Sequence, residues 1–188
     1  MTACNSTSLD DKIILATRCW VEQVIIDMNF CPFAKQVFLD ERIHFQVDNC
    51  NDLESCLQSV ISECQQLDNN NDIETTLLIF THAFQVFDDF IEVIEIANAL
   101  LCDMGYEGIY QLAHFHPDYC FEGNDDSDPA NYTNRSPWPT LHLIREASLE
   151  KALEHYPEPE KIPERNIKRA GEMGINKLRA LLNECSGK

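Results

Sequence analysis

The sequence predicts an α/β protein, at the border with the α+β class, in which helices cover a mixed four-stranded sheet. Short apolar runs rich in β-branched residues alternate with longer segments whose apolar residues recur at helical spacing. This alternation is typical of strand-helix-strand units. A long polar segment then separates the last two apolar runs, so we expect a hairpin with a long loop to complete the sheet.

The first helix is expected over residues 10–28, where one stripe of apolar residues recurs every three or four positions. Ser8 and Asp11 have the spacing of a capping box, and Pro32 ends the helical region. The other expected strands and helices follow in order. They are strands at 43–47, 75–80, 109–116 and 141–145, and helices at 52–67, about 88–104, 148–155 and from 163 onward, the last kinked near Gly171 and Gly174.

The order of these elements favours parallel pairing of the early strands and antiparallel pairing of the last two. A doubly wound sheet and a ferredoxin-like sandwich both fit this order. The 188 residues are expected to form a single domain, with a core at about 9–156 and a C-terminal helical segment at about 160–184.

Composition excludes several classes of protein. A net charge of −18 argues against binding to nucleic acid or to anionic membrane surfaces, because both need Lys and Arg. The chain has no apolar run long enough to span a membrane, and its N-terminus has no features of a signal peptide. Phosphate-loop, dinucleotide-binding, nucleophile-elbow and His-Glu-x-x-His signatures are also missing.

The nine cysteines do not form the pattern of a secreted disulfide framework. Their number is odd, no Cys-x-x-Cys pair occurs, and several fall inside helical patterns. Reduced thiols in a cytoplasm are therefore expected.

Three of the six histidines lie between residues 114 and 142, where a long polar loop is expected. His114 and His116 point the same way on a strand, and His142 joins them if the last two strands pair. We expect His116, with His114, to act in catalysis and Asp118 to orient a histidine. A divalent transition metal held by His114, His116 and His142 is one alternative. The other is that these histidines pack in the sheet or bind loop carbonyls.

Arginines near this loop are candidate anion ligands. Arg135 and Arg145 stand out in an acidic chain, since a guanidinium matches a carboxylate or phosphate with two parallel hydrogen bonds. Asn134 and Ser136 add neutral donors, and Lys35 is a further candidate cation. The alternative is that an arginine fastens the loop to a carboxylate of the chain itself.

Cys31 is a candidate reactive thiol. It precedes Pro32 and lies four residues before Lys35, whose charge favours the thiolate. A thiol-redox protein using Cys31 is one possibility, and a packed thiol in a turn anchored by Phe30 and Phe33 is the other.

Several phrases resemble a known bacterial family. They are Arg18–Val24, Asn29–Ala34, Phe115–Tyr119, Asp128–Pro137, Leu141–Glu146 and Ile162–Asn166. The chain resembles the domain-of-unknown-function family catalogued as number 1415 over roughly residues 15–170. The resemblance implies a bacterial, cytoplasmic protein and carries over no activity and no catalytic residues.

These observations lead to one functional hypothesis and one alternative. The hypothesis is a cytoplasmic enzyme or binding domain for a small anionic molecule, held in a pocket of His, Asp and Arg side chains and assisted by a metal in one version. The alternative is a protein-interaction domain that docks through the aromatic-rich loop at 117–139.

Overall fold

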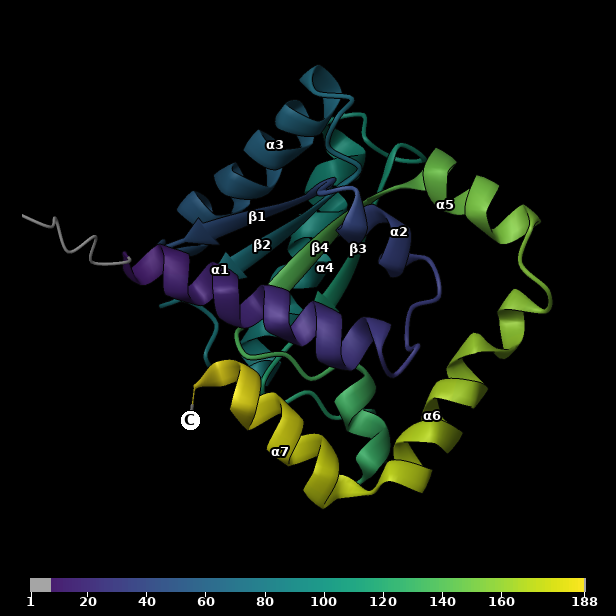
Figure 1. The fold of residues 1–188 in the computed structure, drawn as a ribbon. Coiled ribbons are helices and arrows are strands. Elements are labelled where there is room, and N and C mark those ends of the chain that lie inside the picture. Colours follow the sequence, from purple (N-terminus) through teal and green to yellow (C-terminus); the bar gives the residue numbers. More distant parts are fainter. Residues whose placement is uncertain (1–7, 188) are drawn as a thin grey trace, which may run out of the picture.

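The computed structural model describes residues 8–187 (Figure 1). Its α-helices are α1 (Leu9–Trp20), α2 (Ala34–Leu39), α3 (Leu53–Asn69), α4 (Phe87–Asp103), α5 (Glu146–Glu154), α6 (Ile162–Met173) and α7 (Ile175–Ser186). Its strands are β1 (Ile43–Asp48), β2 (Thr75–Phe80), β3 (Tyr110–Phe115) and β4 (Thr140–Arg145). A π-helix, η1 (Val21–Ile26), continues α1, and two short 3-10 helices are η2 (Pro129–Thr133) and η3 (Pro159–Lys161).

The strands form one mixed sheet in the order β1-β2-β4-β3. β1 and β2 pair in parallel, and β4 pairs antiparallel with both β2 and β3. The predicted mixed four-stranded sheet and the antiparallel pairing of the last two strands are confirmed. The structure adds that β4 is inserted between β2 and β3, so the long loop must carry the chain back into the middle of the sheet.

Helices cover both faces of this sheet, as Figure 1 shows with α1 in front and α4 behind. One core lies between the sheet and helices α3 and α4, and includes Leu78, Phe80 and Leu141. A second core lies on the other face, where Leu77 and Ile79 meet α1, η1 and α7. A ferredoxin-like sandwich keeps its helices on one face, and a doubly wound sheet is mostly parallel, so this architecture is neither.

The first helix begins with the predicted capping box. The Asp11 backbone N–H donates to Ser8 Oγ, and the Ser8 N–H donates to the Asp11 carboxylate. The helix ends as a π-helix, in which the Asp27 N–H bonds to the Glu22 carbonyl five residues back. The sequence pattern does not predict this widening, nor the short helix α2 after Pro32.

At the C-terminus, Gly174 adopts a φ of 76° and separates α6 from α7. The kink predicted near this glycine is therefore a complete break between two helices. Ala170 on α6 and Leu178 and Cys185 on α7 are buried in the second core. Figure 1 shows α5, α6 and α7 as an arc around one side of the molecule. None of the helices in residues 8–187 has both the length and the apolar character that a membrane crossing requires.

The cysteines differ from the expectation in one respect. Cys50 and Cys56 form a disulfide across the loop that leads into α3, with Cα atoms 5.7 Å apart. Reduced thiols were expected throughout, so the expectation is wrong for this pair. Six other cysteines in the described part of the chain are free.

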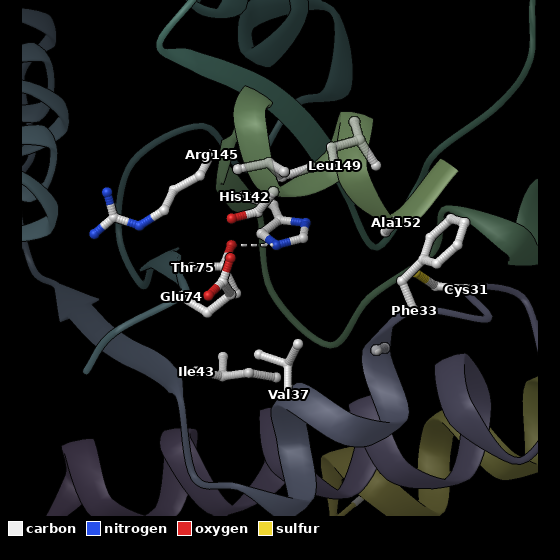
Figure 2. Close-up of a pocket in the computed structure, with 13 residues that line it drawn as sticks. Cys31, Phe33, Val37, Ile43, Glu74, Thr75, His142, Arg145, Leu149 and Ala152 are labelled. Carbon is white, nitrogen blue, oxygen red and sulfur yellow. Dashed lines mark hydrogen bonds between the residues drawn. The ribbon is translucent and has the colours of Figure 1, made fainter. Parts of the chain in front are cut away.

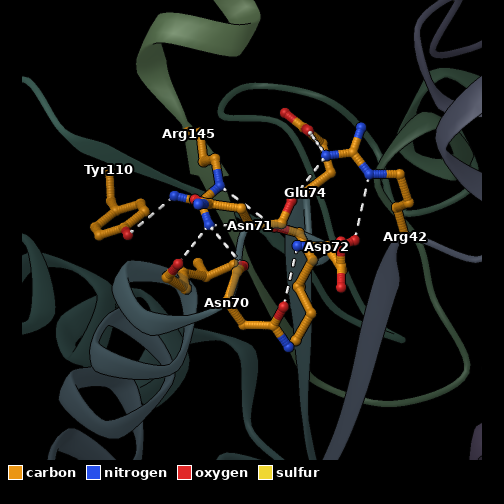
Figure 3. Close-up of polar contacts among 9 residues, drawn as sticks. Arg42, Asn70, Asn71, Asp72, Glu74, Tyr110 and Arg145 are labelled. Carbon is orange, nitrogen blue, oxygen red and sulfur yellow. Dashed lines mark hydrogen bonds and ion pairs between the residues drawn. The ribbon is translucent and has the colours of Figure 1, made fainter.

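Arg145, expected as an anion ligand, instead holds the C-terminal end of α3 (Figure 3). Its Nη2 donates to the carbonyls of Leu67 at 2.5 Å and Asn70 at 3.3 Å, and its Nε donates to Ile73 at 3.4 Å. Its Nη1 lies 3.3 Å from the Tyr110 hydroxyl. A cation at this position complements the partial negative charge of a helix C-terminus. The guanidinium is therefore occupied by the chain's own backbone.

Arg42 supports the same turn from its other side. Its Nε and Nη2 donate to the carbonyls of Asp72 and Asn71, and it pairs with Glu74 at 2.8 Å. Two arginines thus satisfy the carbonyls of the turn between α3 and β2, which fixes where β2 begins.

Replacing Arg145 by methionine should destabilise the fold. The variant keeps much of the apolar stem but leaves the carbonyls at the end of α3 without charged donors, so the free energy of unfolding should fall by about 2–4 kcal/mol. Urea denaturation measures the loss. Arg179→Met, at an exposed position on α7, is the control and should cost less than about 0.5 kcal/mol. A loss at Arg145 as small as at Arg179 would contradict the structural role.

Candidate functional site

Two neighbouring cavities lie on the face of the sheet that carries the second core. The α5 cavity has a volume of about 190 Å³ and lies between α2, the sheet and α5. The α6 cavity has a volume of about 250 Å³ and extends towards η1 and α6. Five residues line both: Cys31, Ala34, Ile43, His142 and Ile144. Because these side chains border both cavities, we treat the two as one site and call them the joined cavities.

The lining is mainly apolar. The α5 cavity adds Phe33, Val37, Glu74, Thr75, Arg145, Ser148, Leu149 and Ala152. The α6 cavity adds Trp20, Val21, Ile25, Phe30, Leu77, Ala113, Phe115, Thr133, Asn134 and Asn166. A mostly apolar cavity with a few polar atoms is typical of a site for a small molecule.

His142 is the polar group at the centre of this site (Figure 2). It lies on β4 between Leu77 of β2 and Ala113 of β3, and it faces the cavities. Its Nε2 lies 2.7 Å from Thr75 Oγ1, and that hydroxyl donates to the Leu143 carbonyl at 2.5 Å. These two contacts fix the orientation of the ring.

The same contacts determine which ring nitrogen carries the proton. A carbonyl only accepts hydrogen bonds, so the single proton of the Thr75 hydroxyl is used by Leu143. The Thr75 oxygen must therefore accept from His142, which places the imidazole proton on Nε2. Nδ1 is then a bare acceptor, and no side chain or backbone group within residues 8–187 donates to it. Figure 2 shows this nitrogen turned towards the side of the cavity formed by Leu149 and Ala152.

Burial lowers the pKa of His142 to about 4. The cause is desolvation, because the apolar surroundings disfavour the imidazolium. At neutral pH the ring is therefore neutral, and its Nδ1 is a weak base. A general base works best when its pKa lies near the working pH, so this histidine is better suited to binding than to proton transfer.

Cys31 lines both cavities but is held as a thiol. Burial raises its pKa, and this effect outweighs the backbone N–H groups of Phe33 and Ala34, which act in the opposite direction. The protonated thiol is a poor nucleophile. Lys35, expected to assist it, is exposed on α2 and lines neither cavity.

The expected convergence of three histidines is wrong. His114 pairs with Leu141 and faces the first core, whereas His142 faces the second, so the sheet lies between them. His114 and His116 do share a side, as predicted, since both rings pack near Phe90. No group of three His, Cys, Asp or Glu side chains suited to a metal ion occurs in residues 8–187.

His116 is fully buried, and both of its ring nitrogens are occupied. Nε2 lies 3.0 Å from the Phe84 carbonyl, and Nδ1 accepts from the Asp118 backbone N–H at 3.0 Å. Burial lowers the pKa of His116. The residue joins the end of β3 to the loop before α4. The Asp118 carboxylate was expected to orient a histidine, but it is the backbone of Asp118 that does so.

Arg135 donates to backbone carbonyls within the long loop, as Arg145 does at the end of α3. Its Nε donates to the Tyr119 carbonyl at 3.0 Å, its Nη2 to that of Asp126 at 3.1 Å, and its guanidinium lies 4.8 Å from the centre of the Tyr132 ring. The expected alternative of a loop-fastening arginine describes it better than anion binding does. Its partners are carbonyls instead of a carboxylate.

The two neutral residues expected to bind an anion, Ser136 and Asn134, lie in different surroundings. Ser136 is buried and donates to the Trp138 carbonyl at 2.6 Å, so it is part of the loop's own framework. Asn134 lines the α6 cavity, where its Oδ1 accepts from the Thr133 hydroxyl at 3.0 Å. Of the expected site residues, the structure therefore brings together Cys31, Asn134, His142 and Arg145 around the joined cavities.

Thr75 is the site residue that sequence reasoning missed. It begins an apolar strand, and its polarity in that run is the one signal that the sequence carries. Its position diagonal to His142 follows from the register of β2 with β4, which no local pattern specifies.

The pH dependence of stability should report the burial of His142. Between about pH 6.5 and pH 4 the unfolded chain takes up a proton at this residue and the folded chain does not, so stability should fall by up to about 3 kcal/mol. His142→Gln keeps a donor towards Thr75 and removes this titration. Urea denaturation of both proteins at intervals between about pH 7 and pH 4.5 should give a steeper loss for the natural chain, by up to about 1.4 kcal/mol per pH unit. Parallel curves would show that His142 is not buried as a neutral ring.

The comparisons with known proteins identify the family. A family model described as "Protein of unknown function (DUF1415)" matches residues 12–180. No curated protein and no solved structure matches the chain. The matched region covers almost the whole sequence, so the resemblance seen in the sequence phrases is confirmed and the chain belongs to the DUF1415 family.

Proposed function

We propose that this protein binds a small, mainly apolar molecule in the joined cavities, with His142 as its polar anchor. The observation that carries the proposal is the bare Nδ1 of His142 in an apolar site. A ligand with an N–H or O–H group would donate to this nitrogen, and a hydrogen bond in apolar surroundings is stronger than one in water.

The size of the site supports this class of ligand. Each cavity alone, about 190 and 250 Å³, is smaller than the range of about 300–1,000 Å³ that is usual for small-molecule sites. The two volumes taken together reach that range. The ligand we propose therefore passes His142 and occupies part of both cavities.

Binding is favoured over acid–base catalysis. With a pKa of about 4, His142 would be a weak base at neutral pH, and the raised pKa of Cys31 makes it a weak nucleophile. The anion-binding role expected for Arg135 and Arg145 has no support, because both donate to backbone carbonyls. Docking through the loop at 117–139 is supported less than the cavity, because Tyr132 is buried and Trp138 packs against the second core.

The proposed compartment is a bacterial cytoplasm. The six free cysteines in residues 8–187 support it, since such thiols persist in a reducing environment. The Cys50–Cys56 bond is the observation against it.

A fluorescent probe tests the binding proposal. N-phenyl-1-naphthylamine is neutral and apolar, has one N–H donor, and emits strongly only in apolar surroundings. The natural chain should bind it, and Ala34→Phe should weaken binding at least about tenfold, because residue 34 lines both cavities and the added ring fills them. Fluorescence titration gives both affinities.

Two further variants make the result specific. Leu39→Phe places a ring at an exposed position of the same helix and should leave the affinity unchanged. His142→Gln should weaken binding by about two- to tenfold, which is the net value of one hydrogen bond. Circular dichroism confirms that each variant is folded. Equal affinities for the natural chain and Ala34→Phe would mean that the probe binds elsewhere.

A further inference from the structure

A group of basic side chains lies on α6, in a chain whose net charge is −18. Arg165, Lys168 and Arg169 line a surface hollow of about 230 Å³ together with Asn29, Asn166 and Glu172. We call this hollow the basic mouth. Three cations and one carboxylate leave it with a local charge of +2, opposite in sign to the rest of the molecule.

The cations of the basic mouth have no carboxylate partners within residues 8–187. Arg165 donates to the Tyr156 hydroxyl at 3.0 Å and lies 5.3 Å from the centre of that ring, so a neutral group orients it. Lys168 and Arg169 are exposed, and neither makes an ion pair or side-chain hydrogen bond in the described part of the chain. This differs from Arg18 and Arg42, which pair with Glu41 and Glu74, and from the half-buried Arg135 and Arg145, which donate to backbone carbonyls.

Two arginines of the basic mouth repel each other along α6. Arg165 and Arg169 are four residues apart on one side of the helix, where like charges cost about 0.2–0.5 kcal/mol. A bound anion would offset this cost.

The basic mouth adjoins the α6 cavity. Asn166 lines both of them, and its Nδ2 donates to the Phe30 carbonyl at 2.7 Å, where the two meet. Phe30 lines the cavity and the preceding Asn29 lines the mouth. The charged surface hollow and the apolar cavity are therefore neighbours that share one asparagine side chain.

We propose that the ligand is an organic anion with an apolar body. Its acidic group binds Arg165, Lys168 and Arg169 at the basic mouth, and its apolar part extends past Asn166 into the α6 cavity towards His142. This inference rests on the proposed function and names its ligand class. The proposed anion site is therefore on α6, whereas the sequence led us to expect it at Arg135 and Arg145.

A matched pair of probes tests the role of the mouth. 1-Anilino-8-naphthalenesulfonate has the ring system and N–H group of N-phenyl-1-naphthylamine with one added sulfonate. The natural chain should bind the sulfonate more tightly than the neutral probe. In the variant Arg165→Gln, Lys168→Gln, Arg169→Gln, the ratio of the two affinities should fall about tenfold, and salt near 1 M should lower it similarly in the natural chain.

A control variant has the same change in net charge elsewhere. Lys12→Gln, Lys151→Gln and Lys177→Gln alter three exposed lysines that line neither the mouth nor the cavities. The control should keep the affinity ratio of the natural chain within about twofold. An equal fall in the control and the mouth variant would overturn the inference, because net charge alone would then explain the effect.

The remaining outcomes separate this inference from the proposed function. If the natural chain binds both probes equally and the mouth variant leaves their ratio unchanged, the basic mouth has no role and the cavity proposal stands. If neither probe binds the natural chain, or if Ala34→Phe does not weaken the neutral probe, the proposed function fails and this inference fails with it.

Discussion

The insertion of β4 between β2 and β3 is the constraint on which the rest of this structure depends. Because side chains alternate along a strand, the register of β4 sends Leu141 and Leu143 into one core and His142 and Ile144 to the other face. A slip of one residue would exchange the two sets and bury an imidazole among the side chains of α3 and α4. The register also brings Arg145 to the end of α3.

At the centre of the site, desolvation and hydrogen bonding act together on His142. The apolar cavity disfavours the charged ring, and the Thr75 hydroxyl, already committed to a carbonyl, accepts the one proton that the neutral ring can donate. Desolvation selects the neutral ring, and the hydrogen bond selects the tautomer with a bare Nδ1. The site is consequently arranged to accept a hydrogen bond, which is why a binding role follows more directly from the geometry than a catalytic one.

The arginines show how an acidic chain divides a small number of cations. Arg145 and Arg135 satisfy backbone carbonyls at a helix end and inside a long loop, where a neutral side chain would supply fewer donors. Both arginines therefore have a structural role, although in the sequence they lie close to residues expected to form the functional site. The cations on α6 are different, because they are exposed and lie where the cavity approaches the surface.

Most of the fold followed from local patterns in the sequence. The capping box at Ser8, the buried run at 75–80 and a kink near Gly174 each depend on residues within one turn or one strand, so propensity and periodicity predict them, although the kink proved to be a full break. Local patterns did not predict two features, the π-helical end of the first helix and the helix after Pro32, since packing against neighbouring elements determines them.

The candidate site was predicted only in part, because the pairing of strands in the sheet decides which side chains meet. The sequence by itself determined which residues are chemically capable, including Cys31, Asn134 and His142, and it determined that β3 and β4 would pair. Only the tertiary structure decided that His114 and His142 lie on opposite faces, that Thr75 meets His142, and that Arg145 reaches the end of α3. Those placements depend on pairing between strands distant in sequence, and the free energy of that pairing comes from two whole cores and not from any local pattern.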